Sequence, residues 1–229
     1  TDETLKKMQS KYQIHIVKGD GSWFYSGGMH AGMEYAKEKL SDDFDYMLMI
    51  NDDVTFLEKC ISRMIEQSKD QNKAVIVGAM RDESGSQSYG AFKYTEGYKY
   101  RRLNISEWQL EADTFNANCV LVPYKAFEHV GSIDSFYCHS LGDFDYGLSL
   151  KRAGYKIFQS KEFVGICNNN SNQNTWTDTN LGRIERIRKK ESVKGAPTKQ
   201  WFYFLKKNFG LGLALKGVVT PYIRILIGK

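Results

Sequence analysis

Short apolar runs alternate with amphipathic stretches over most of the chain. Residues 46–50, 74–78 and 119–122 are continuous apolar runs. Runs of this length without polar positions are typical of strands that are buried on both faces. The stretches between them repeat with helical periodicity. This alternation predicts an α/β fold, in which helices cover both faces of a mostly parallel sheet.

The remaining elements have weaker patterns. The sequence predicts a short N-terminal helix through Leu5 and Met8, and a turn at 19–22. Residues 84–113 are polar and rich in Tyr and Gly, which is typical of hairpins or a long insertion, and 168–179 read as a polar loop. We expect further helices over 57–68 and 124–130, from Ser26, and from near Asp143 to Gly154, and further strands over 13–17 and 155–158.

The charge is unevenly distributed. The formal net charge is +5, yet residues 181–229 hold twelve Lys and Arg against Glu185 and Glu191, a net +10. Residues 1–180 therefore carry −5. The asymmetry predicts an acidic body over 1–180 and a basic, amphipathic helical tail over 181–229.

The tail is the part of the chain best suited to contact a membrane. Its most apolar stretch, 209–228, is interrupted by Lys216, Pro221 and Arg224, so we expect it to lie on a membrane and not to cross one. The alternative is a pair of helices that pack on the body with their charges in water. In the membrane interpretation, anionic lipid meets Lys206, Lys207, Lys216 and Arg224, with Trp201, Phe202 and Phe204 at the interface.

Neither a nucleic-acid partner nor a disulfide framework is expected from the sequence. The basic residues come without a recognisable nucleic-acid-binding motif, so nucleic acid is not an expected partner. The four cysteines are scattered, with no CxxC pair and no zinc-binding spacing. Free thiols in a reducing compartment are favoured over a disulfide framework, so we expect a cytoplasmic location. In the membrane interpretation of the basic tail, that location is the inner face of the plasma membrane.

Adjacent carboxylates follow the first continuous apolar run, in the sequence Asn51-Asp52-Asp53. Ligands of open α/β sheets bind outside the carboxyl ends of the strands. Neighbouring carboxylates repel each other unless a cation lies beside them, and Mg²⁺ or Mn²⁺ prefers such oxygen ligands and binds diphosphate oxygens as well. The alternative is a solvated acidic turn that caps a helix beginning near Thr55.

A second acidic group lies at the start of a predicted helix. Gly142 and Asp143 stand where backbone N–H groups and the helix dipole favour an ionised carboxylate. Such a carboxylate can accept the proton of an attacking hydroxyl group. The alternative is an Asp that only caps the helix. His139 lies in the same polar stretch.

Glycine is concentrated at 19–22 and 26–28. Neither segment has the GxxxxGK[ST] pattern of a P-loop or the spacing of GxGxxG, so nucleotide binding does not follow from them. Close approach of the backbone to a ligand and simple turn chemistry explain them equally well.

Together these segments resemble the inverting family 2 glycosyltransferases of the GT-A fold, and especially a bacterial subgroup that includes rhamnosyltransferases of surface polysaccharide assembly. Residues 142–155, GDFDYGLSLKRAGY, are similar to the family segment E-D-x-D-[LY]-x-L-R-x-x-x-A-G-[YF]. Residues 46–53 resemble the strand with the Asp-x-Asp metal motif, and 19–28 the loop before the second helix. Weaker similarities cover 1–4, 115–120, 175–176 and 194–197.

The resemblance implies a Rossmann-like GT-A sheet with a C-terminal helical extension, a bound Mg²⁺ or Mn²⁺, a UDP- or dTDP-sugar donor, and a carbohydrate or lipid-linked glycan acceptor. It places Asp143 at the position of the catalytic base. The implied metal ligands are Asp53, Asp52 and Asn51, and the implied donor-binding residues are Ser26, Gly27, Gly28 and Asp52. The implied acceptor-binding residues are Asn116, Asn118, His139, Asp145 and Trp176.

The chain departs from the family pattern at several points. Asn51 replaces the first Asp of Asp-x-Asp, Gly142 replaces the Glu before the base, and no His follows His139 to complete a metal site. Family members also carry a first βαβ unit ahead of the position of Thr1. We therefore expect the GT-A domain, 1–180, to be N-terminally incomplete.

These features predict a metal-dependent hexosyltransferase that transfers a sugar with inversion. A sugar nucleotidyltransferase would need a Gly-rich, Arg-containing N-terminal loop that these residues do not contain. An inactive fragment or a degenerate nucleotide-sugar-binding protein stays open as the alternative. The intact segment around Asp143 favours an enzyme.

Overall fold

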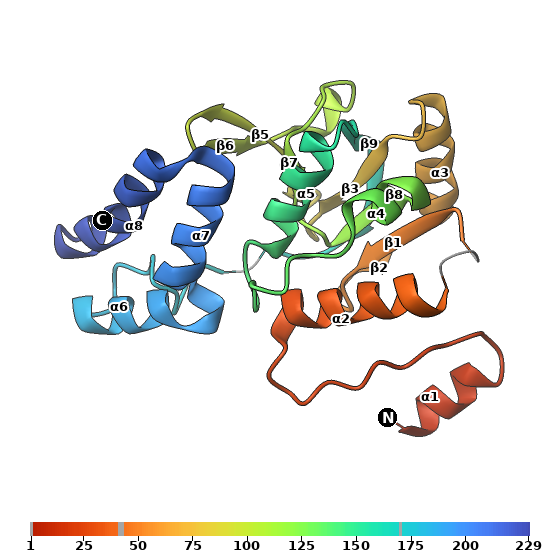
Figure 1. Cartoon of the computed structure of the whole chain (residues 1–229), viewed down its shortest axis with the longest axis horizontal. Coiled ribbons are helices and arrows are strands. Elements are labelled where there is room, and N and C mark those ends of the chain that lie inside the picture. Colours follow the sequence, from red (N-terminus) through yellow and green to blue (C-terminus); the bar gives the residue numbers. More distant parts are fainter. Residues whose placement is uncertain (1, 41–43, 170) are drawn as a thin grey trace.

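The computed structural model describes residues 2–40, 44–169 and 171–229 (Figure 1). Helices and strands alternate through the first part of the chain, and helices alone make up its C-terminal part. The helices are α1 (Asp2–Gln9), α2 (Phe24–Lys39), α3 (Cys60–Asp70), α4 (Tyr124–Val130), α5 (Gly142–Arg152), α6 (Arg183–Glu191), α7 (Thr198–Phe209) and α8 (Leu211–Leu226). The strands are β1 (Tyr46–Ile50), β2 (Thr55–Phe56), β3 (Val75–Arg81), β4 (Gln87–Tyr89), β5 (Ala91–Glu96), β6 (Lys99–Arg102), β7 (Thr114–Phe115), β8 (Cys119–Pro123) and β9 (Ile157–Ile166).

The main sheet has the strand order β1-β8-β3-β9-β2, with β4 paired to β3. The strands β1, β3 and β9 run in one direction, because β8 is antiparallel to both β1 and β3, and β9 is parallel to β3. The sheet is therefore mixed. Three of its long strands share a direction, as the sequence predicts, but the reversed β8 lies between two of them. A second, small sheet has the order β6-β5-β7.

Helices cover both faces of the main sheet (Figure 1). Alternation along β3 divides its side chains: Val75 and Val77 pack in one apolar cluster and Ile76 in the other. The first cluster joins residues of α2, α4 and α5, and the second joins Cys60 and Met64 of α3. The two-layer covering explains why the strands of the sequence are apolar at nearly every position.

One predicted strand is wrong. Residues 13–17 are extended coil between α1 and α2, and Ile16 and Val17 are exposed. No strand in the described part of the chain pairs with them, and an alternating pattern forms a strand only when a neighbour satisfies its backbone groups. Other boundaries shift slightly: α2 begins at Phe24 and not at Ser26, α3 begins at Cys60, and β9 extends to Ile166.

The C-terminal helices pack on the body. Phe204, Leu205 and Ala214 form an apolar cluster with Tyr137, and partly buried aromatic residues surround it. Phe204 is buried in this cluster and so does not lie at a membrane interface, whereas Trp201 and Phe202 are only partly buried, and a membrane contact of the tail stays a prediction. The packed-helix alternative holds for α7. Within the described residues, no helix is long and apolar enough to span a bilayer.

Helix α8 continues through Pro221. A proline has no backbone N–H, so the carbonyl of Gly217, four residues earlier, loses its helical donor. The indole Nε1–H of Trp201 donates to this carbonyl oxygen at 3.0 Å. Gly217 also allows close approach, because a Cβ there would lie 2.2 Å from Leu205 Cδ1. Helices α7 and α8 are therefore held together by specific contacts close to Pro221.

Candidate active site

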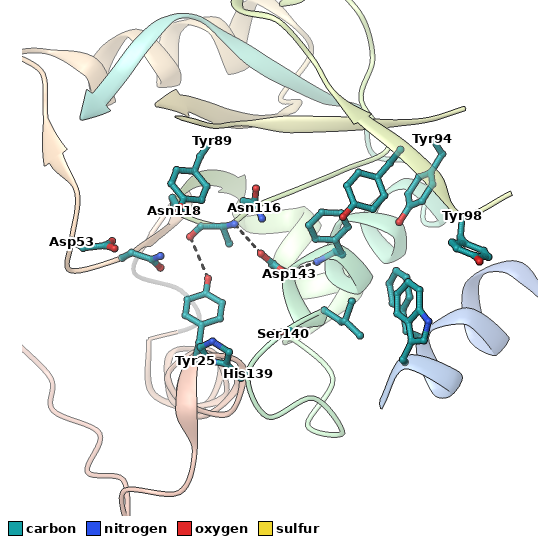
Figure 2. A pocket seen from close by; sticks show the side chains of 17 residues that line it. Tyr25, Asp53, Tyr89, Tyr94, Tyr98, Asn116, Asn118, His139, Ser140 and Asp143 are labelled. Atoms are coloured by element: carbon teal, nitrogen blue, oxygen red, sulfur yellow. Dashed lines mark hydrogen bonds between the residues drawn. The ribbon is translucent and has the colours of Figure 1, made fainter. Parts of the chain in front are cut away.

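A cleft of about 480 Å³ opens where the main sheet, the small sheet, α5 and α7 meet (Figure 2). It lies at the carboxyl end of β1, where Ile50 pairs with Cys119 at the start of the antiparallel β8. Strand order thus brings the residues after β1 beside those before β8. The lining residues are Tyr25, Asn51, Asp53, Tyr89, Tyr94, Tyr98, Tyr100, Asn116, Ala117, Asn118, His139, Ser140, Leu141, Asp143, Phe144, Trp201 and Phe204.

Asp143 points into this cleft from the first turn of α5 (Figure 2). Its Oδ1 accepts from the backbone N–H of Phe144 at 2.9 Å, and its Oδ2 accepts from that of Ala117 at 3.3 Å. Burial raises the pKa of Asp143 to about 6, although these N–H groups and Asn116 oppose the rise. The capping alternative is wrong, because the residue that caps α5 is Leu141.

The backbone before Asp143 is strained. Leu141 adopts φ +72°, in the left-handed region that non-glycine residues rarely occupy. A residue held there costs on the order of 1 kcal/mol, and such outliers gather at functional sites. Leu141 packs beside Tyr137 and Phe204, which hold it in place. This left-handed residue is the N-cap of α5 and lies two residues before Asp143.

Tyr25 of α2 lies across the cleft from this carboxylate (Figure 2). Its hydroxyl donates to the carbonyl of Ala117 at 3.2 Å, so it fixes the same loop that hydrogen-bonds Asp143. Burial, and then the nearby charge of Asp143, raise the pKa of Tyr25 well above its ordinary value. Tyr25 therefore stays a neutral hydrogen-bonding group. It was not among the predicted site residues.

The predicted metal ligands divide between the cleft and the surface. Asn51 and Asp53 line the cleft and Asp52 does not, although both Asp residues are exposed. The Oδ1 atom of Asn51 is buried without a hydrogen-bond partner among the described residues. That oxygen and the Asp53 carboxylate are the donor types that Mg²⁺ and Mn²⁺ prefer, so the residues fit such a cation. Within the described residues, no group of three His, Cys, Asp or Glu side chains is arranged to hold a metal alone.

Three of the predicted acceptor-binding residues come together in the cleft. Asn116 hydrogen-bonds Asp143, and Asn118 bonds Cys167 through its Nδ2 atom, 3.6 Å from the sulfur. His139 has a buried Nδ1 atom that meets no partner in the described residues. Burial and then Lys194 lower the pKa of His139, so its imidazole is neutral near pH 7.

Two other predicted acceptor residues lie elsewhere. Asp145 is buried outside the cleft, where it accepts from Lys207 Nζ at 2.6 Å and from Asn208 Nδ2 at 2.8 Å. It does not line the cleft, because α7 covers it, so the geometry gives its predicted acceptor role no support. Trp176 lines an adjoining cavity beside α8, under the guanidinium of Arg224, and is not among the residues that line the cleft.

The glycine-rich segment of α2 has a structural role in place of the predicted donor contact. Ser26 is fully buried, and its hydroxyl donates to the carbonyl of His139 at 2.7 Å. Gly142 faces it, and a Cβ on Gly142 would lie 2.5 Å from Ser26 Oγ. Gly27 donates to the carbonyl of Cys138. Neither Gly27 nor Gly28 lines the cleft, so their predicted donor contact has no support in its geometry.

An aromatic wall forms the far side of the cleft, and the sequence did not reveal it. Tyr94, Tyr98 and Tyr100 come from β5, β6 and the turn between them, and Trp201 comes from α7 (Figure 2). The Tyr94 hydroxyl is buried without a partner in the described part of the chain. The signal was the tyrosine-rich stretch 84–113, which the pattern predicts as hairpins or a long insertion without placing it beside α5 and α7.

The fold is α/β, and the cleft at the carboxyl end of β1 is its candidate active site. The family model described as "Glycosyl transferase family 2" matches residues 1–131, more than half of the chain. The chain belongs to this family, and its fold is GT-A. No curated protein sequence matches it significantly. The match ends before Asp143, so the role of that residue rests on its geometry.

Proposed function

We propose that the chain transfers a sugar from a UDP- or dTDP-sugar to a hydroxyl group of a carbohydrate or lipid-linked glycan, with inversion at the anomeric carbon. The observation that carries the proposal is Asp143. It is a carboxylate in the cleft whose pKa is about 6, held by neutral donors. A base with a pKa near the working pH is the most effective proton acceptor.

The chemistry is one displacement. The hydroxyl oxygen of the acceptor forms a bond to the anomeric carbon while the bond from that carbon to the diphosphate oxygen breaks. The hydroxyl proton passes to Asp143, and the bonding electrons leave with the nucleoside diphosphate. Attack from the face opposite the leaving group inverts the anomeric configuration.

Asp53 and Asn51 would hold Mg²⁺ or Mn²⁺, which supplies positive charge to the diphosphate when bound. Both residues line the same cleft as Asp143. Tyr25 and the Ala117 loop fix the orientation of Asp143 independently of that cation. The chain's own residues therefore separate two tasks: one end of the cleft orients the base and the other binds the donor.

The aromatic wall supports an acceptor that is a saccharide. Tyr94, Tyr98, Tyr100 and Trp201 offer flat apolar faces with polar edges, which suit the two sides of a sugar ring. The buried Tyr94 hydroxyl and His139 Nδ1 are unused hydrogen-bonding groups, and an acceptor can satisfy them. We assign the acceptor side to this wall together with Asn116 and Asn118.

We further propose a role in bacterial surface polysaccharide assembly, with the enzyme working at the cytoplasmic face of the plasma membrane as the resembling rhamnosyltransferase subgroup implies. The basic C-terminal helices support this setting. A lipid-linked acceptor would meet the enzyme there.

The test is calorimetric titration with UDP and with dTDP, each with and without Mn²⁺, followed by release of the nucleoside diphosphate from the matching sugars on a panel of glycan acceptors. Cation-dependent binding followed by acceptor-dependent release supports the proposal. Binding without release by any donor–acceptor pair would instead indicate a degenerate nucleotide-sugar-binding protein. Absence of binding by the folded chain would contradict the donor assignment.

A further inference from the structure

Helix α8 presents a continuous apolar face to solvent. Leu211, Leu215, Val219 and Ile223 recur every four residues, and each is more than half exposed. Leu226 and Ile227 extend the row at 58% and 59% exposure. At helical spacing these side chains share one side of the helix. A run of this kind is not an incidental exposed leucine, because it extends along the whole element.

The opposite side of α8 is already engaged. Ala214, Gly217 and Ile225 are buried. The ring of Tyr222 lies under the ammonium of Lys190 on α6, and its hydroxyl bonds Glu191 at 2.6 Å. The helix is therefore fixed in its orientation, and its apolar face has no packing role within the described chain. Figure 1 shows α8 at the extreme end of the molecule, away from the main sheet.

The surroundings of this face are positively charged. Residues 192–229 contain seven Lys and Arg and no Asp or Glu. Lys216 and Arg224 lie on α8 itself and are exposed. Ile184 of α6, 71% exposed, lines a shared hollow with Ile225 and Gly228 and adds to the apolar surface at the helix end. An apolar stripe in an acid-free basic stretch complements a surface that is both apolar and anionic.

We infer that the α8 face (Leu211, Leu215, Val219, Ile223, Leu226 and Ile227) docks on an anionic phospholipid bilayer. The helix lies parallel to the membrane: sixteen residues span about 24 Å, less than the ~30 Å hydrocarbon core. The apolar row enters the acyl boundary, and Lys216 and Arg224 meet the phosphates. This surface is carried by α8, and not by the aromatic residues of α7. The inference deepens the membrane setting of the proposed function by naming the surface that makes the contact, and it does not depend on the proposed sugar transfer.

A second copy of the chain is a poorer occupant. A two-fold contact through α8 would bring Lys216 and Arg224 toward the same residues of the other copy. No carboxylate in 192–229 is available to neutralise them, and Glu96 of β5, which lies near Lys216, is already paired with Lys99 at 2.9 Å. An anionic bilayer supplies both the apolar layer and the opposite charge.

Vesicle flotation of the full chain tests the inference. The probes are vesicles of phosphatidylcholine alone and of phosphatidylcholine with phosphatidylglycerol. We expect binding to the anionic vesicles, weakening with salt. The double variant L215E/V219E should reduce the partition coefficient at least about tenfold, and K216Q about fivefold. The matched control is Ile16→Glu, an exposed apolar residue in the coil between α1 and α2, which should bind like the wild type.

The vesicle test and the transfer assay can fail independently of each other. D143N should bind vesicles like the wild type, so a failed transfer assay leaves this test intact. Failure of the wild-type chain to float with anionic vesicles would overturn the inference, as would equal binding by K216Q, which preserves the fold because its side chain is exposed. A wild-type dimer in solution that L215E/V219E converts to a monomer would also overturn it, since the face would then be a self-contact.

Discussion

Asp143 and Asp145 lie on the same turn of α5, yet the two sides of that turn give them different roles. On the cleft side, Asp143 meets backbone N–H groups and an amide, and burial raises its pKa to about 6. On the side covered by α7, Asp145 meets the ammonium of Lys207 and the amide of Asn208. A carboxylate paired with a cation stabilises the contact between two helices, whereas a carboxylate without a cationic partner can accept a proton. The neighbouring element, and not the residue type, decides which.

The largest expected effect comes from removing the unpaired carboxylate. D143N should lower transfer by about 10²–10⁴-fold, the usual contribution of a general base, because its amide cannot accept the acceptor proton. The affinity for UDP or dTDP should stay within about twofold of the wild type. Nucleoside-diphosphate release and calorimetry measure the two quantities. Equal loss of both would indicate that Asp143 binds the donor.

Removing the partnered carboxylate should act on stability instead. Asp145→Ala leaves Lys207 and Asn208 without a buried acceptor, so we expect a loss of about 3 kcal/mol in the free energy of unfolding. Asp134 still accepts from Lys207 and limits the loss. Urea denaturation measures it. If Asp145→Ala kept the urea midpoint of the wild type but lost sugar transfer, Asp145 would have a catalytic role and the contrast with Asp143 would be wrong.

The stability of D143N should change in the opposite direction. The folded pKa of Asp143, about 6, lies above its ordinary 3.8, so the stability that protonation confers is complete below pH 3.8 and is lost as the pH rises through 6. At pH 8 the wild type keeps a buried charge that the variant lacks. D143N should therefore be more stable there by on the order of 2 kcal/mol, and the difference should vanish below pH 4. Urea midpoints at pH 4 and pH 8 check the sign, which would be wrong if D143N were less stable at pH 8.

The smallest effect belongs to a second pair of adjacent acids. Asp53 lines the cleft and Asp52 does not. Asp53→Ala should weaken Mn²⁺-dependent nucleotide binding about tenfold, whereas Asp52→Ala, the matched control, should change it less than twofold. Calorimetry in the presence and absence of Mn²⁺ measures both. If both variants weakened Mn²⁺-dependent binding equally, lining the cleft would not distinguish Asp53 from Asp52 as a metal ligand.

Much of the fold could be predicted because its core strands are apolar at nearly every position. The runs 46–50, 74–78 and 119–122 became β1, β3 and β8. The predicted strand at 13–17 failed because an alternating pattern does not specify a partner. The reversal of β8 between β1 and β3 also has no local signal, since apolar residues pack alike in either direction.

The site was predictable only where its chemistry is local. Their positions at a helix start and a strand end made Asp143 and Asp53 candidates, and both line the cleft, while their roles stay predictions. Sequence could not show that Asp143 lies in the cleft and Asp145 outside it, because that difference depends on where α7 packs, about sixty residues later. Ser26 was misassigned for a similar reason: it fits under His139 because Gly142, far along the chain, lacks a Cβ. The aromatic wall joins β5, β6 and α7 and has no local signature.

The most direct test of the contrast is a carbon-13 NMR titration of the Asp carboxyl groups. The resonance that disappears in D143N should titrate near pH 6, far above the ordinary value of 3.8. Such a value would confirm that the cleft holds an unpaired carboxylate ready to accept a proton near neutral pH. Titration of that resonance at or below pH 4 would show a carboxylate stabilised in its charged form, and would contradict the assignment of Asp143 as the base.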